Sequence, residues 1–394
     1  MKTTSLCALC LTLSTATAQT LELEGLDGRV TERELAGFET SDPRTAGAIF
    51  VRVLGFPAPP EIAEAARCRV GLAGGDVLVG RVLGGQGELL DLGLAGGAPL
   101  RLSIEGVRSL VFPGRLVEGA APPEPAEKGD RLYRTRGRGL DRVDGVVVGF
   151  RAEGVAFEGL IGERTYAWDE VGALFVEALD EVTAPEDAPG VRVSATLRGG
   201  GRVSGRLVAF DAAGCRMTAA AGALALPAQL IAELAVEDGS YSFLSQLAPD
   251  DLGPLSPYDP PGVEPLGMSY PPRVDLAVSG DPLRAGGKRW SRGLGVHAPS
   301  RLTWKLDGGW KELRVQAAID DQVLRRRARG AVRFRIWVDG EQRYESPEVQ
   351  GGDPVLVIPA VALDGARELV LEVDPGDDWR MDRADWLRPL LIRA

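Results

Sequence analysis

The sequence predicts an all-β protein in which tandem small β-barrels are followed by a jelly-roll β-sandwich. Glycine (51 residues) and proline (27) are abundant. No long apolar stripe of helical period stands out, and short alternating runs are separated by turn residues. With 394 residues and 44% hydrophobic content, the chain is long enough for about two to four domains.

Residues 1–18 are expected to form a secretory signal peptide. Lys2 supplies the positive start, Leu6–Leu13 the apolar core and Ala16–Ala18 the small residues of a cleavage site. The apolar run is too short to span a bilayer. We therefore expect cleavage near Ala18 and a secreted, periplasmic or cell-envelope protein, attached to the envelope peripherally at most.

Two of the four cysteines lie in this signal. A lipoprotein would need a small residue before Cys7 or Cys10, and both follow a leucine. Cys68 and Cys215 remain after cleavage. Export permits a disulfide, but the two lie in different repeats and nothing in the sequence fixes their separation. We expect two buried free thiols.

A weak internal repeat runs through the N-terminal part of the chain. Each unit has a strand, a glycine turn, a second strand, central strands and an apolar closing strand; Val203–Phe210 shows the alternation that buries one face. We place three small barrels within residues 19–117, 129–182 and 190–238, with a Pro-rich linker at 118–128. The layout resembles Sm-like or SH3-like barrels.

The first of these regions also holds two extra strand-like segments, 21–30 and 48–53. We expect them to complete or pair with the first barrel. Sm-like barrels often bind RNA, but these strands lack interleaved basic and aromatic residues. The net charge of −11 also argues against nucleic acid, because neutralising phosphates needs a basic surface.

Residues 240–394 are expected to form the β-sandwich. Short strands recur there, separated by turns such as Asp307–Gly309 and Asp339–Gly340, and this spacing suits a jelly roll. The predicted strands are 274–278, 302–306, 312–319, 331–338, 342–346, 355–358, 368–373 and 390–393.

Five motifs in this region resemble one family, which is NPCBM/NEW2, also called carbohydrate-binding module family 51. They are Tyr241–Leu247, Gly293–Ala298, Ala318–Val323, Val332–Gly340 and Asp382–Trp386. The resemblance implies a sandwich that binds galactose-type or related glycans, with a structural calcium ion in some members. The family usually has a histidine where this chain has Arg383, and a guanidinium recognises ligands differently from an imidazole.

The residues themselves also suit a sugar. Six of the seven tryptophans lie in the last third of the chain, and indole faces near oxygen acceptors can cover a C–H face and accept hydroxyl hydrogen bonds. Trp290 is the best exposed candidate, whereas Trp337 is expected in the core. We expect a site at the loops around 290–297 and 379–386, formed by Trp290, His297, Trp379, Arg383, Asp385 and Trp386.

His297 is the only histidine in the chain. It can hydrogen-bond to a sugar hydroxyl, or it can be a buried imidazole bonded to an acid such as Asp385. Zinc is not expected, because no second histidine exists to share the ligand set.

Calcium is the one metal we expect, at Asp320 and Asp321, since it takes clustered oxygen ligands. The same carboxylates could instead cap a turn or pair with arginines at 325–329. Asp374, Asp377 and Asp378 form a second acidic loop, read as a solvated turn or a metal site. The arginine-rich run 324–329 is read as a solvated loop or a contact for an anionic glycan.

The predicted function is glycan binding without catalysis. No Gly-x-Ser-x-Gly elbow, His-Glu-x-x-His motif or phosphate-binding loop occurs in the sequence. Two alternatives stay open. One is a cell-envelope scaffold whose barrels bind protein partners. The other is a glycoside hydrolase with an unrecognised pair of carboxylates.

Overall fold

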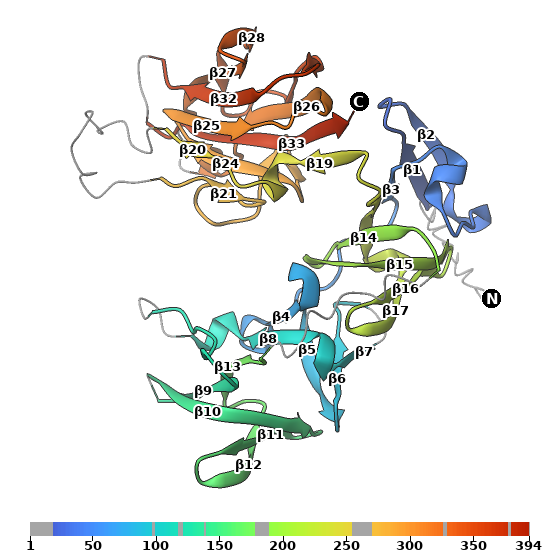
Figure 1. The fold of residues 1–394 in the computed structure, drawn as a ribbon, viewed down its shortest axis with the longest axis vertical. Coiled ribbons are helices and arrows are strands. Elements are labelled where there is room, and N and C mark those ends of the chain that lie inside the picture. Colours follow the sequence, from blue (N-terminus) through green and yellow to red (C-terminus); the bar gives the residue numbers. More distant parts are fainter. Residues whose placement is uncertain are drawn as a thin grey trace, which may run out of the picture. The chain divides into compact units, whose positions relative to one another are not determined.

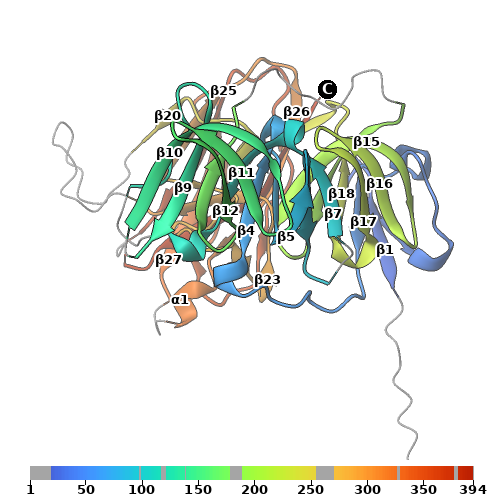
Figure 2. The same ribbon diagram turned by 90° about the horizontal axis from the view of Figure 1, so that it is seen from below.

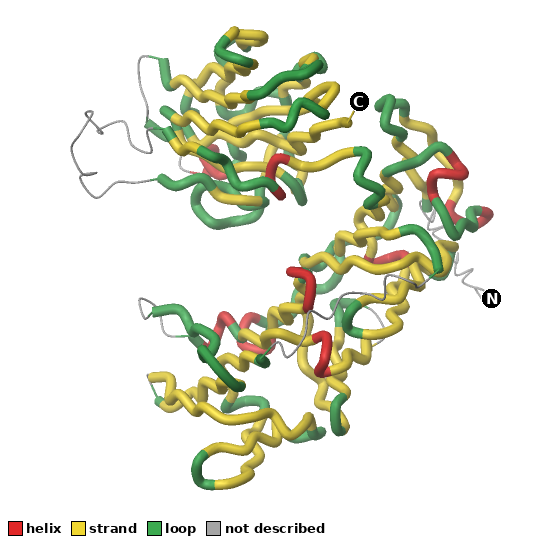
Figure 3. Tube along the Cα trace, viewed as in Figure 1, coloured by secondary structure: helices red, strands yellow, loops and turns green. Residues whose placement is uncertain are grey.

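The computed structural model describes residues 19–96, 99–116, 121–137, 139–177, 189–253, 270–325, 329–376 and 380–393. The chain divides into two compact units, residues 1–237 and 238–394. Strands dominate both units (Figures 1 and 3). α1 (Gln322–Arg325) is the sole α-helix in the described ranges. The all-β prediction is confirmed. Within those ranges, no helix has the length and apolar character needed to cross a membrane.

The N-terminal unit contains three repeats of five strands each. The first has β4 (Cys68–Leu72), β5 (Val77–Gln86), β6 (Leu89–Gly93), β7 (Pro99–Ser103) and β8 (Val107–Val111). The second has β9 (Asp130–Arg136), β10 (Gly139–Phe150), β11 (Gly154–Gly159), β12 (Gly162–Ala167) and β13 (Val171–Phe175). The third has β14 (Arg192–Leu197), β15 (Gly201–Asp211), β16 (Gly214–Ala219), β17 (Gly222–Pro227) and β18 (Ile231–Val236).

Each repeat is a meander of antiparallel strands in which the fifth strand returns to pair with the first. Figure 2 shows the curved strands β9–β12 of the second repeat and β15–β17 of the third. The long second strand carries a β-bulge in every repeat, beside Leu83, Val148 and Val208. All three aliphatic side chains are exposed. The strands fall within the predicted boundaries, and the likeness to Sm-like or SH3-like barrels stays a prediction.

The repeats are joined by hydrogen-bonded strand pairs. β8 of the first pairs with β13 of the second, and β5 of the first pairs with β15 of the third. The N-terminal strands β1 (Thr20–Glu24), β2 (Val30–Glu34) and β3 (Phe50–Val53) form their own meander. β3 pairs with β18 of the third repeat. The expectation that these strands pair with the first repeat was therefore wrong, because β18 offers the free edge that β3 fills.

Short 3-10 turns connect several strands of this unit. They are η1 (Leu35–Gly37), η2 (Pro43–Ala46), η3 (Glu64–Ala66), η4 (Ala73–Gly75), η5 (Ile104–Gly106), η6 (Pro113–Arg115) and η7 (Ala228–Leu230). Cys68 and Cys215 are both buried and free, as predicted. Burial raises the pKa of each thiol to about 12, so both stay protonated and unreactive at neutral pH.

The C-terminal unit is a sandwich of two antiparallel sheets. The sheet that we call the site sheet contains β19 (Tyr241–Phe243), β21 (Arg273–Val274), β24 (Gly293–His297), β26 (Trp310–Ile319), β30 (Leu356–Val357), β31 (Val361–Ala362) and β33 (Arg383–Arg393). The opposite sheet contains β20 (Asp251–Leu252), β25 (Ser300–Lys305), β27 (Ala331–Val338), β28 (Glu341–Glu345), β29 (Val349–Gln350) and β32 (Glu368–Asp374). The hairpin β22 (Arg284–Ala285) and β23 (Lys288–Arg289) and the turn η8 (Leu244–Gln246) complete the unit.

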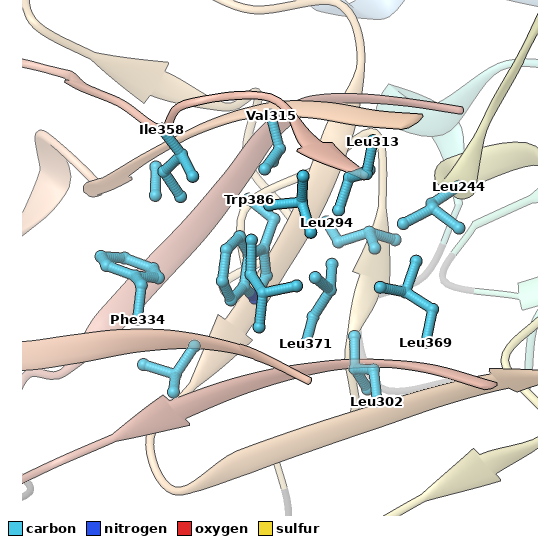
Figure 4. Close-up of a cluster of buried hydrophobic side chains, with 14 of the residues drawn as sticks. Leu244, Leu294, Leu302, Leu313, Val315, Phe334, Ile358, Leu369, Leu371 and Trp386 are labelled. Atoms are coloured by element: carbon cyan, nitrogen blue, oxygen red, sulfur yellow. The ribbon is translucent and has the colours of Figure 1, made fainter. Parts of the chain in front are cut away.

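One apolar core fills the space between the two sheets (Figure 4). Leu302, Phe334 and Leu371 reach it from the opposite sheet, and Leu294 and Trp386 from the site sheet. Phe334 and Trp386 meet edge to face with ring centroids 4.9 Å apart. Alternating inward residues on both sheets thus make an apolar core, and the residues between them point to the outer faces.

Candidate functional site

The outer face of the site sheet brings together most of the predicted site residues. Leu294 and Val296 of β24 lie in the core, so their neighbours Gly293, Gly295 and His297 point to the outer face. On β33, Ala384 and Trp386 lie in the core, so Arg383, Asp385 and Leu387 share that same outer face. His297 is directly opposite Arg383, and Gly295 is opposite Asp385.

The segment 275–283 covers part of this face, and the glycines of β24 make that possible. A Cβ on Gly295 would lie 2.3 Å from the carbonyl oxygen of Leu276, and a Cβ on Gly293 would lie 2.9 Å from a methyl carbon of Leu283. Real Cβ atoms do not approach this closely. The Gly-x-Gly-x-His motif therefore combines two close backbone approaches with one outward imidazole at the end of the strand.

His297 is buried, with 5% of its surface exposed. Its Nδ1 lies 2.7 Å from the carbonyl oxygen of Ala298, so this nitrogen carries the proton and donates. The ring stacks on Tyr270, with 4.3 Å between centroids. Burial, reinforced by the nearby positive charge of Arg383, lowers the pKa of His297, so the imidazole is neutral. The alternative of a bond from His297 to Asp385 is wrong, because Nδ1 donates to Ala298 and neither oxygen of Asp385 accepts a hydrogen bond from a described residue.

Asp385 is 1% exposed and neither of its oxygens accepts a hydrogen bond from the described residues. Burial raises its pKa well above the usual range, and the negative charges of Asp320 and Asp321 raise it further. The raised pKa favours the protonated form of this carboxyl group. Solvent does not reach Asp385. It is therefore not placed to accept a hydrogen bond from a sugar hydroxyl, contrary to the expectation.

Asp320 and Asp321 follow β26 and hold the hairpin β22–β23 through its backbone. Oδ2 of Asp320 accepts from the N–H of Arg284 at 3.1 Å, and Oδ2 of Asp321 accepts from the N–H of Gly287 at 2.9 Å. Oδ1 of Asp320 accepts from the N–H of Gln322 at 2.8 Å. In the described ranges no three His, Cys, Asp or Glu side chains are grouped as a metal site. Calcium at this pair stays a prediction.

The second acidic loop is only partly described. Asp374 lies 2.6 Å from Arg335 in an ion pair and accepts from the N–H of Gly376 at 2.8 Å. Asp377, Asp378 and Trp379 lie outside the described residues, as do residues 326–328 of the arginine-rich run.

Trp290 follows the hairpin and is half-buried. Its Nε1 donates to the carbonyl oxygen of Ala285 at 3.2 Å. The ring packs against a small cluster of Ala285, Ala318 and Leu387 on the outer face. The indole is therefore fixed by one hydrogen bond and one apolar contact while part of it faces solvent, which is the arrangement needed for a stacking platform.

The four other tryptophans in the described ranges of the C-terminal unit divide between the core and the outer face of the opposite sheet. Trp304, Trp310 and Trp386 are at most 7% exposed. Trp386 is thus a core residue, contrary to the expectation that it contacts the ligand, because its position on β33 points inward. Trp337 was expected in the core, but it is half-buried on the outer face of the opposite sheet. The guanidinium of Arg301 lies 5.8 Å from its ring.

Two features of this face were not among the predicted site residues. Tyr270 lies in a Pro-rich stretch, and only the tertiary structure brings it onto His297. The hairpin β22–β23 places Arg284 directly opposite Arg289. Its signal in the sequence is the Gly286-Gly287 pair, which is typical of a two-residue hairpin loop.

Comparison with known proteins identifies the domain that carries this face. Residues 261–392 match the model of the NPCBM/NEW2 domain, so the resemblance predicted from the five motifs is confirmed for this segment. The match supports a carbohydrate-binding role for the C-terminal unit.

One curated relative is alpha-1,3-galactosidase B of Akkermansia muciniphila. It is 34% identical over 119 residues, which are 29% of this chain and 14% of the relative. The chain therefore matches only a small part of that protein's length.

Two solved structures are also similar. A CBM51 from Clostridium perfringens GH95, in complex with methyl-galactose, is 18% identical with a TM-score of 0.32, covering 38% of this chain and 99% of the other. CBM51-2 with the INT domains of Clostridium perfringens ZmpB, in complex with GlcNAc, is 19% identical with a TM-score of 0.33, covering 61% and 43%.

Proposed function

We propose that this protein binds galactose-type or related glycans through the outer face of its site sheet and does not hydrolyse them. The observation that carries the proposal is the half-buried indole of Trp290, fixed through Ala285 on a hairpin that Asp321 holds in place. Because the platform is formed before binding, little ordering entropy opposes the ligand. The NPCBM/NEW2 match over residues 261–392 supports a carbohydrate-binding role for the domain that carries this face.

Binding combines stacking with polar contacts at the ends of β24 and β33. The apolar C–H face of the sugar rests on Trp290, and Arg383 donates to hydroxyl oxygens. Single-site affinity is expected to be weak, with a Kd of about 10⁻⁵ to 10⁻³ M.

Galactose is proposed as the sugar class because the relative with 34% identity is named as an alpha-1,3-galactosidase. This chain matches 14% of that relative, so we propose that it shares the recognition part and not the reaction. A glycoside hydrolase is the alternative. Incubation with chromogenic galactosides decides between the two, because turnover that copurifies with the chain would contradict pure binding.

The test of binding is retention of the full chain on immobilised galactose-terminated glycans, with mannose-terminated glycans as the specificity control. Trp290→Ala should abolish retention, since it removes the stacking platform. Trp337→Ala is the matched control, because this half-buried tryptophan lies on the outer face of the opposite sheet. If Trp337→Ala lost retention and Trp290→Ala kept it, the binding site would lie on the opposite sheet, and the proposal would be contradicted.

Export, calcium and other partners belong to the same proposal. We propose a secreted or envelope-associated protein after removal of residues 1–18, in which calcium beside Asp320 and Asp321 steadies the hairpin. Running the retention assay with and without a chelator tests the metal. Binding that survives chelation would leave no role for calcium in recognition. Failure to bind any glycan would favour a scaffold whose repeats bind proteins.

A further inference from the structure

We propose that copies of this protein associate head to tail, with the second repeat of one copy joined to the N-terminal strands β1–β3 of the next. The partner is a second copy of this chain. The inference goes beyond glycan binding and does not depend on it. It is carried by the strand pairs that already join the repeats within one chain.

The strands β1–β3 form an abbreviated repeat. In each complete repeat the first strand pairs with the second and with the fifth, and β1 pairs with β2 and with β3 in the same way. Leu110 lies opposite Leu174 where the fifth strands of the first two repeats meet. Val51 lies opposite Leu234 where β3 meets β18. β1, β2 and β3 therefore correspond to a first, second and fifth strand, and residues 35–49 replace the third and fourth.

Two kinds of strand pair link these four units into a row. Fifth strands join the abbreviated repeat to the third repeat, and the first repeat to the second. Second strands join the third repeat to the first, where β15 pairs with β5. The row thus ends in the second strands β2 and β10. Within the described residues, β2 pairs with β1 alone, and residues 139–144 of β10 pair with β9 alone. Each strand keeps a free edge that can pair with another chain.

The two free edges match each other. Arg202 of β15 lies opposite Val77 of β5. Both hold the same place in their repeats, because the residue after each one pairs with a buried residue of the first strand. By this rule Val30 holds that place in β2 and Arg142 in β10. Joining β10 to β2 of another copy would repeat the pairing of arginine with valine. Joining two copies of β10 would place Arg142 opposite itself, and like charges directly opposite destabilise a strand pair.

A turn contact accompanies the pair of β5 and β15. The N–H of Ser103 donates to the carbonyl oxygen of Ala221, in the turn between β16 and β17, at 3.1 Å. A Cβ on Gly106 would lie 2.4 Å from the Cα of Ala221. The matching turn of the second repeat, between β11 and β12, holds Leu160 and Ile161, which are 105% and 80% exposed. Exposed apolar side chains thus lie where the third repeat contacts a neighbour, as expected of an interaction surface.

The abbreviated repeat offers the other half of this contact. η2 (Pro43–Ala46) precedes β3 as η5 precedes β8. Gly47 stands four residues before Val51, and Gly106 stands four residues before Leu110. A Cβ on Gly47 would meet nothing within 4 Å. The space that Ala221 fills at Gly106 is therefore open at Gly47, where Ile161 of another copy can enter.

Side-chain charges also fit across the proposed contact. Asp76 accepts hydrogen bonds from the backbone N–H and the hydroxyl of Ser204 between the first and third repeats. The same two places are held by Arg29 before β2 and by Asp144 in β10, and both side chains are exposed. Asp144 lies 2.6 Å from Arg131, and a carboxylate can accept from a second guanidinium. An ion pair between copies would thus replace the contact of Asp76 with Ser204.

The experiment measures the average molecular mass of the chain from residue 19 onward by sedimentation equilibrium at increasing concentration. The contact is small, so we expect weak association, with a Kd of about 10⁻⁵ to 10⁻⁴ M. Because each copy uses two different surfaces, the mass should rise past that of a dimer. A mass that stays that of a monomer at ~1 mM, tenfold above the weakest expected Kd, would overturn the proposal.

Two variants block the two ends separately. Ile161→Asp places a carboxylate in the apolar contact of the second repeat, and Arg29→Glu/Thr31→Glu places two carboxylates opposite those of β10. Each variant alone should stay monomeric. An equimolar mixture should form a dimer and nothing larger, because one free end of each kind remains. Val208→Asp is the matched control, since this valine is 55% exposed in the third repeat, outside both ends. It should associate like the parent.

Other outcomes would contradict the head-to-tail contact. A dimer formed by Arg29→Glu/Thr31→Glu alone would mean that second repeats pair with each other. Both variants should unfold at the temperature of the parent, because all three substituted residues are exposed. Leu160→Asp, at the same turn, replaces Ile161→Asp if that variant is less stable. Association by both aspartate variants would show that the turn takes no part, and would overturn the proposal.

Glycan binding is measured separately on the same proteins. A soluble monovalent galactoside should bind the parent and both variants equally, since the substitutions lie in the N-terminal unit. Retention on immobilised glycans should fall in the variants, because a row of chains carries several weak sites and gains avidity. Loss of association with intact galactoside binding, or the reverse, shows which of the two proposals fails.

Discussion

The imidazole of His297 and the phenol ring of Tyr270 lie face to face, with 16° between their planes. The stack keeps water away from the only histidine of the chain, and burial is the main reason that its pKa is lowered. His297 is therefore a neutral element of the site at physiological pH, and its protonation opposes the folded state.

This gives a pH prediction. Above pH ~6.5 the imidazole is neutral in both states; below it the unfolded chain binds a proton that the native protein binds only at lower pH. The free energy of unfolding should fall by up to about 1.4 kcal/mol per pH unit between those two pKa values. Denaturant unfolding of the parent and of His297→Gln, followed by tryptophan fluorescence from pH 7.5 to 5, measures it. Parallel curves for the two proteins would refute the lowered pKa.

For Asp385 we predict the opposite dependence of stability on pH. Its pKa is raised, so the native protein keeps a proton that the unfolded chain releases above pH ~3.9, and stability falls as pH rises toward the native pKa. Asp385→Asn cannot ionise. We expect this variant to be more stable than the parent at pH 7 and equal to it at pH 3.5. Thermal unfolding at both values tests this.

Asp320→Ala is the counterpart of that variant. It removes the acceptor for two backbone N–H groups, those of Arg284 and Gln322. Leaving these part-buried donors without partners costs at most about 1–3 kcal/mol. The free energy of unfolding should drop by that amount at pH 7, while Asp385→Asn raises it. Equal effects from both variants would contradict the raised pKa of Asp385.

Trp386 predicts the largest loss of stability. It is fully buried, and its indole N–H has no hydrogen-bond partner among the described residues. Trp386→Ala should cost about 3–5 kcal/mol through the cavity it leaves. Trp386→Phe keeps most of the volume and removes the unsatisfied N–H, so its loss should be much smaller. Urea unfolding ranks the two, and a phenylalanine variant as unstable as the alanine one would argue against core packing.

The two free thiols predict a labelling pattern. With a pKa of about 12, Cys68 and Cys215 carry almost no thiolate, and the thiolate is the reactive form. An alkylating reagent at pH 8 should modify neither residue in the folded chain and both in denaturant, as read by peptide mass mapping. Modification of either cysteine under native conditions would show that the repeat that contains it unfolds locally.

Much of the sandwich could be predicted from residue alternation alone. The strand predicted at 331–338 has those bounds in the structure, as β27. β33 was predicted only from residue 390, yet it begins at Arg383. Its first half carries Arg383 and Asp385 on an outer face that the segment 275–283 covers. A strand whose outer face is covered by another segment does not show the alternation of apolar and polar residues that is typical of a half-exposed strand.

β24 was missed for a related reason. All five residues from Gly293 to His297 are buried, so the strand has no polar face. Its two glycines are typical of a turn in local sequence, and only the neighbouring segments explain them. Trp337 was misjudged because an apolar residue was equated with the core. It occupies the position between Ile336 and Val338, and both of those point inward.

The site was predictable in residue type more than in arrangement. Trp290, His297 and Arg383 do share one outer face, because β24 and β33 are paired. The protonated state of Asp385 was beyond sequence reasoning, since it depends on burial and on Asp320 across the sheet. The partner of β3 was likewise unpredictable, because distant strand pairing leaves no local signal.

The strand pairs that join the repeats affect how the N-terminal unit unfolds. β5–β15, β8–β13 and β3–β18 link each repeat to a neighbour through main-chain hydrogen bonds. If one repeat unfolded, a strand of the neighbouring repeat would lose its hydrogen-bonded partner and expose its edge. Exposed strand edges favour aggregation. The three repeats should thus melt in a single cooperative step, and a fragment holding just one of them would be a poor choice for expression.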